Sequence, residues 1–218
     1  MKQFTCELEG RSVVLVGSFN PSIFHPAWFE KFGLISREES TNAKIEIVRP
    51  ELSNFVVGSV SVLVTPDRFQ LETPDPASAN QLRDIAIGSF RVLDQTPFTQ
   101  MGVNHHMHFK MDSVELWHKV GHTLVPKAIW SDLIESPGTL RVVVTGKRKG
   151  SSAKSVNATV EPSTKVVPGV YVGVNEHFQL AQDQQSQFLI DILNTQWDEI
   201  HKFGRFLGDE LLKRCLKD

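Results

Sequence analysis

The chain has 218 residues, of which 40% are hydrophobic and 22% are charged, and its formal net charge is −2. This composition is typical of a packed globular protein and excludes a disordered chain, and the small acidic excess argues against nucleic-acid binding. The sequence shows neither a hydrophobic leader nor an apolar run of about 18 residues, and its two cysteines match no disulfide framework or metal motif. We therefore expect a cytoplasmic, reduced protein that does not contact a membrane.

The first part of the chain alternates between strand and helix patterns. Residues 13–16 form an apolar run that predicts a strand, and aromatic residues at near-helical spacing predict a short helix over residues 24–34. Alternation predicts further strands over residues 44–48 and 55–65, and the turn residues Pro66 and Asp67 lead into a return strand over residues 68–72. Asp75 and Pro76 then open a helix that Pro97 ends.

The second part follows a similar order. Residues 101–109 alternate as a strand, and helical patterns cover residues 113–120 and 126–134. Strands are predicted over residues 140–145 and 155–160, joined by the basic loop 147–149. This loop could bind phosphate, but we interpret it as a turn with solvated charges. Residues 170–180 predict a strand or a tight hairpin, and the last helix spans about residues 183–216 with a break near Gly204 or Gly208.

The two parts carry an internal repeat. The segments 60–64 and 170–174 are valine-rich strands, each is followed by a Phe-Gln-Leu triplet at 69–71 and 178–180, and each leads into a helix with the same apolar and Asp spacing. The repeat predicts an α+β protein of two similar strand–helix–three-strand–helix halves, residues 1–97 and 98–218, that form one antiparallel sheet with helices on one face. The alternative is an accidental likeness within an unrelated α+β domain.

Two resemblances follow from these patterns. The element order resembles the duplicated TATA-binding-protein-like fold. The segment from Leu63 to Thr73, with its Thr-Pro-Asp and Leu-Glu-Thr triplets, is followed by a helix and by a strand containing Gly102, and it resembles a sporadically distributed prokaryotic family of uncharacterised proteins. The family pattern of Arg-Tyr-apolar-Asn is replaced here by residues 104–107, Asn-His-His-Met. The resemblance implies a fold and brings no activity with it.

An antiparallel sheet covered on one side leaves its other face open to a partner. Alternation places on this open face a mixed polar set comprising Ser59, Ser61, Asn104, His106, His108, Arg141 and Tyr171, and Asn175 follows in the same pattern. The leading hypothesis is therefore a non-enzymatic protein that binds a macromolecule through this face, with a protein partner or a second copy of the chain as the occupant. The alternative is a solvated sheet face without function.

Histidines supply a second hypothesis. His118 and His122 are four residues apart on a predicted helix and could hold a divalent metal, and together with His106 and His108 they could form a metal-dependent enzyme or sensor site. No glutamate stands between them as in zinc proteases, and structural histidines are the alternative. No other cofactor is predicted. A third hypothesis, nucleic-acid binding, rests only on the likeness to the TATA-binding topology, and fold does not imply function.

Overall fold

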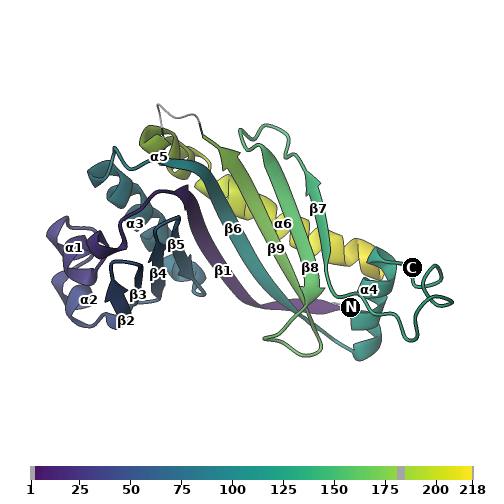
Figure 1. Ribbon diagram of the computed structural model, residues 1–218. Coiled ribbons are helices and arrows are strands. Elements are labelled where there is room, and N and C mark those ends of the chain that lie inside the picture. The colour runs from purple at the N-terminus through teal and green to yellow at the C-terminus, as the bar shows by residue number, and fades with distance from the viewer. Residues whose placement is uncertain (1–2, 181–184, 218) are drawn as a thin grey trace.

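The computed structural model describes residues 3–180 and 185–217, which form one antiparallel sheet with helices on one side (Figure 1). Among these residues no helix is both long and apolar enough to cross a membrane. The first half contains β1 (Phe4–Gly17), η1 (Pro21–Ile23), α1 (Pro26–Lys31), α2 (Arg37–Thr41), β2 (Lys44–Arg49), β3 (Leu52–Val57), β4 (Val60–Thr65), β5 (Arg68–Thr73), η2 (Pro76–Ser78) and α3 (Ala79–Val92). The second half contains β6 (Phe98–Met111), α4 (Val114–Leu124), β7 (Val142–Gly146), β8 (Ser155–Pro162), β9 (Gly169–Gln179), α5 (Gln185–Thr195) and α6 (Trp197–Leu216).

The nine strands lie in the order β2-β3-β4-β5-β1-β6-β9-β8-β7. The two longest strands, β1 and β6, pair with each other at the junction of the halves, with Val13 opposite Val103. In the first half the chain runs from β1 through helices to the edge strand β2, returns through β3 and β4 to β5 beside β1, and ends in α3. In the second half it runs from β6 through α4 to the edge strand β7, returns through β8 to β9 beside β6, and ends in α5 and α6. This order confirms the predicted α+β class, the single antiparallel sheet and the arrangement in two halves.

The first half contains one more strand than predicted. Residues 55–65 belong to two strands, β3 and β4, because a two-residue turn at Gly58 and Ser59 interrupts them and pairs Val57 with Val60. Gly58 has a φ of 58°, a conformation that glycine adopts at little cost. The valine alternation continues on both sides of the turn, so the pattern resembles one strand. The matched segments of the repeat consequently span β4 and β5 in one half and β9 alone in the other.

Two helix predictions differ from the structure. Residues 126–134 form turns and not a helix, within the long connection from α4 to β7. The C-terminal helical segment is divided at Gln196, between α5 and α6, and α6 continues without interruption through Gly204 and Gly208. The start expected at residue 183 lies outside the described residues.

The core lies between the sheet and its helices. Along each strand, alternate side chains point to this covered face, as the period of two requires. In the first half, phenylalanines from α1, β3, β5 and α3 pack edge to face or tilted, with Phe69 and Phe90 at a centroid distance of 5.1 Å. In the second half, α4 and α6 cover β6, β8 and β9 through a smaller cluster that includes Met107, Phe109 and Leu212.

Helix α6 lies so close to β6 that a side chain at Gly204 would not fit. A Cβ atom on Gly204 would lie 2.7 Å from Nδ1 of His105. Gly204→Ala is therefore expected to lower the free energy of unfolding by about 1–2 kcal/mol through overpacking, although alanine is the better helix former. The matched control is Gly121→Ala in α4, where the nearest atom would be 3.5 Å away, so that stability should rise by up to about 1 kcal/mol. Urea denaturation of both variants measures the contrast, and equal effects would contradict it.

Candidate binding site on the open sheet face

The face of the sheet opposite the helices carries a continuous row of polar side chains. The pairing registers place one polar residue from each of seven neighbouring strands opposite the next, from β4 to β7. We call this set the polar row; it consists of Ser61, Glu72, Ser12, Asn104, Asn175, Asn157 and Thr145. Neighbouring members are separated by the strand spacing of about 4.8 Å, so the row crosses the sheet at right angles to the strands.

Hydrogen bonds connect the members of the polar row in the second half. The Thr145 hydroxyl donates to Asn157 Oδ1 over 2.9 Å, and Asn157 Nδ2 donates to Asn175 Oδ1 over 3.2 Å. Asn175 Nδ2 then donates to Asn104 Oδ1 over 2.7 Å. Each amide is oriented by its neighbour, so the row presents donors and acceptors in fixed positions. A surface of this kind can bind a partner with little further ordering of its side chains.

A hollow of about 300 Å³ lies beside the centre of the polar row. Its floor contains Gly102, where a Cβ atom would lie 2.7 Å from Asn175 Nδ2. One wall is formed by three hydrogen-bonded side chains of β5. Arg68 donates to Gln70, and Gln70 donates to Glu72 over 3.0 Å. Amide, guanidinium, imidazole and carboxylate groups therefore line this hollow together with Val14 and Val16, so that it offers both hydrogen-bonding and apolar contacts to a partner.

His106 and Tyr171 lie beside the polar row and are coupled to it. Ser12 Oγ is 3.1 Å from His106 Nε2, and Tyr171 Oη is 2.7 Å from His106 Nδ1. The Tyr171 ring lies over the backbone of Gly173, where a Cβ atom would be only 2.5 Å from Tyr171 Oη. Glycine at this position is therefore what allows the tyrosine to reach the histidine.

Burial determines the charge state of these groups. The pKa of His106 is lowered because burial disfavours the imidazolium ion, and this effect outweighs the attraction of the Glu72 carboxylate. Burial also raises the pKa of Tyr171 to about 12. Both side chains are thus neutral hydrogen-bonding groups near pH 7. A serine nucleophile is not supported, because Ser12 is only 2% exposed and a phenol, not a carboxylate, contacts the far side of the imidazole.

The remaining residues that were predicted for the open face differ in their surroundings. Ser61 is a member of the polar row, whereas the Ser59 hydroxyl lies in the β3–β4 turn and bonds to Thr73, whose side chain is buried. His108 is covered by the connection between β8 and β9, since its Nδ1 is 2.8 Å from Ser163 Oγ. Arg141 precedes β7 and forms an exposed ion pair over 3.7 Å with Glu161, the residue opposite Tyr171 in the sheet.

The two predicted metal ligands lie on α4, on the helix side of the sheet. The rings of His118 and His122 are 6.1 Å apart and nearly perpendicular. Within residues 3–180 and 185–217, no group of three or more His, Cys, Asp or Glu side chains is arranged to hold a metal ion. The structure therefore does not bring His118 and His122 together with His106 and His108. The pair instead lines a cleft beneath α4.

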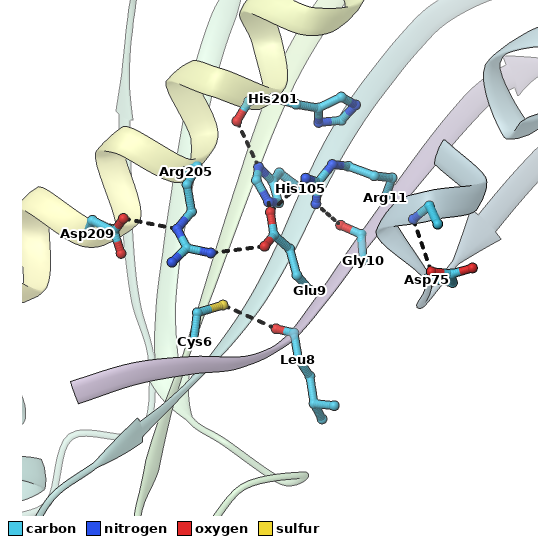
Figure 2. Close-up of polar contacts among 11 residues, drawn as sticks. Cys6, Leu8, Glu9, Gly10, Arg11, Asp75, His105, His201, Arg205 and Asp209 are labelled. Carbon is cyan, nitrogen blue, oxygen red and sulfur yellow. Dashed lines mark hydrogen bonds and ion pairs between the residues drawn. The ribbon is translucent and has the colours of Figure 1, made fainter. Parts of the chain in front are cut away.

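The covered face contains a network of charges that the sequence patterns did not indicate (Figure 2). Glu9 Oε1 accepts hydrogen bonds from Arg11 over 2.6 Å and from His105 Nε2 over 2.7 Å, and Glu9 Oε2 contacts Arg205 of α6 over 2.9 Å. Arg205 also binds Asp209 over 2.9 Å. These contacts lower the pKa of Glu9 to about 2, with the hydrogen bond from His105 as the main cause.

Strand alternation is the sequence pattern that could have revealed this network. Residues 9 and 11 continue the inward-facing positions of Val13 and Leu15, but the predicted strand began only at residue 13, so both charged residues were left outside it. The same alternation places Glu176 among the inward valines of β9. Arg148 binds this fully buried carboxylate over 2.5 Å, so it is not one of the solvated charges that we predicted for its loop.

No protein-family model matches the chain, and no curated protein matches it. The resemblance to the sporadically distributed prokaryotic family stays a prediction.

Proposed function

We propose that this is a non-enzymatic binding protein whose open sheet face engages a protein partner. The observation that carries the proposal is the polar row, which crosses seven strands on the face that the helices leave free. Its amides are already oriented by one another, and a hollow lies beside its centre. Pre-arranged amide donors and acceptors favour recognition of polar surfaces over acid–base chemistry.

Two open-face variants with matched controls test the proposal. Arg141→Glu reverses an exposed charge on the open face, and Lys202→Glu reverses an exposed charge on α6. Tyr171→Ala removes the aromatic group beside the row, and Phe32→Ala removes a partly exposed aromatic group on the helix side. Tagged forms of all four variants and of the wild-type protein are used to capture partners from the native cells, with quantification by mass spectrometry.

We expect both open-face variants to lose at least about 90% of a captured partner, which corresponds to a tenfold change in affinity, while both controls retain it. Native mass spectrometry of the same preparations detects a second copy of the chain as the partner. A partner that both open-face variants retain at the wild-type level would show that another surface binds it. Absence of any partner, including a second copy, with the wild-type protein would also contradict the proposal.

A further inference from the structure

A cleft of about 490 Å³ lies beneath α4, on the helix side and distinct from the polar row. Its volume is within the range of about 300–1,000 Å³ that is typical of small-molecule sites. Helix α4 forms one wall, the ends of β8 and β9 form a second, and the connection between α4 and β7 forms the outer wall. Ligand binding in this cleft is independent of the function proposed for the open face.

The inner walls of the cleft are mainly apolar. Trp117, Val120 and Leu124 contribute from α4, and Val160 and Val170 contribute from the two strands. Because apolar surface is stabilised by contact with apolar groups, these walls favour a hydrocarbon chain over a polar ligand. The outer connection also exposes several large apolar side chains, which is typical of a surface that meets other apolar molecules: Ile129, Trp130, Leu133, Ile134 and Leu140.

One cation in the cleft lacks a negatively charged partner. The Lys127 ammonium donates to the Thr139 hydroxyl, which in turn donates to the Gly121 carbonyl over 3.0 Å. Within the described parts of the chain, no carboxylate lies within ion-pair distance of Lys127. Glu161 also lines the cleft, but its charge is offset by the ion pair with Arg141. His118 and His122 line the same cleft and can donate further hydrogen bonds.

We propose that this cleft binds a single-chain amphiphile with a carboxylate head group. The chain lies against the apolar wall of α4, β8 and β9, and the head group accepts a charge-assisted hydrogen bond from Lys127. Recognition of the head group thus requires one positive charge, and recognition of the chain requires the empty volume. These two requirements can be removed separately.

The test measures binding of three probes with the same chain and different head groups. Decanoate, decanol and decylamine are titrated into the full-length protein, with isothermal calorimetry as the readout. The two ionic probes stay below their micelle-forming concentrations, and decanol stays below its solubility limit. We expect decanoate to bind at least about tenfold more tightly than decanol, since a hydrogen bond to a charged group contributes about 1.5 kcal/mol or more, and decylamine to bind most weakly. Equal binding of decanoate and decanol would overturn the head-group assignment.

Two variants and a control complete the test. Lys127→Met keeps the aliphatic stem and should weaken decanoate binding about tenfold while decanol binding stays unchanged. Gly121→Leu places a side chain toward Thr139 within the cleft and should abolish binding of both probes. Lys149→Met, in the exposed β7–β8 connection, should change neither. The proposal is overturned if the wild-type protein shows no saturable binding of decanoate, or if Lys127→Met binds it as well as the wild type does.

Discussion

Replacing Glu9 by glutamine is expected to lower the free energy of unfolding by about 3 kcal/mol. Among residues 3–180 and 185–217, Glu9 has the one carboxylate that contacts Arg11, His105 and Arg205 together. Arg11 is 8% exposed and His105 is 1% exposed, so neither can exchange the carboxylate for bulk water. Glu9→Gln leaves the buried Arg11 guanidinium without its carboxylate partner. Breaking a buried ion pair in this way costs about 3–5 kcal/mol, and the lower end applies because Glu9 itself is partly exposed.

Guanidinium denaturation of Glu9→Gln and of a matched control measures this effect. The control is Asp84→Asn, which removes the carboxylate of an exposed ion pair with Arg83 and should change stability by less than about 1 kcal/mol. Arg205→Met should also be milder than Glu9→Gln, because Arg205 is more exposed and Glu9 would keep two partners. If Glu9→Gln and Asp84→Asn had equal effects, the network would contribute no more than a surface pair.

The network joins the two halves of the protein. Glu9 and Arg11 belong to β1 of the first half, whereas His105 and Arg205 belong to β6 and α6 of the second. Their contacts lie where the two central strands pair and where α6 crosses them (Figure 2). Buried charges of this kind are weak evidence for stability but can specify one arrangement over another. In this fold they connect α6 to the two central strands at the junction of the halves.

The class of the fold was predictable from the sequence because it depends on patterns that repeat along the chain. Valine alternation in residues 60–64 and 170–174 defines which face of each strand is buried, and both segments follow it in the structure. Prolines and Asp75 marked the start and the end of α3 correctly to within a few residues. These signals are local, and therefore the sequence alone contains them.

The site was predictable only in part, because it depends on strand register. Alternation assigned Asn104 and His106 to the open face, but only the pairing of six further strands shows that Asn104 belongs to a row. The turn at Gly58 was not predicted, and a helix break was predicted near Gly204, where glycine instead allows α6 to lie close to β6. A glycine is compatible with a turn and with a close approach, and the residue alone does not show which of the two it serves. Contacts with residues distant in the sequence decide between the two, and they also decide that the C-terminal helical segment breaks at Gln196.

Lowering the pH from 7 to 5 is expected to reduce the free energy of unfolding by about 2 kcal/mol through His201 alone. Burial lowers the pKa of His201 from 6.5 to about 2, assisted by the positive charge of Arg11. The folded protein therefore keeps this ring neutral, while the unfolded chain takes up a proton below pH 6.5. The contribution is fully present above pH 6.5 and is lost as the pH falls toward 2. The pKa values of His105 and His106 are lowered in the same direction and add to the loss.

His201→Phe isolates this contribution. Neither ring nitrogen of His201 has a hydrogen-bond partner among the described residues, and the ring packs edge to face on Trp197 at a centroid distance of 4.3 Å. A phenyl ring can keep that contact without a buried polar atom, so the variant should be at least as stable as the wild type at pH 7. Its loss of stability between pH 7 and 5 should be smaller by about 2 kcal/mol. Urea denaturation at both pH values gives the comparison, and parallel curves for the two proteins would show that His201 takes up a proton equally in the folded and unfolded states.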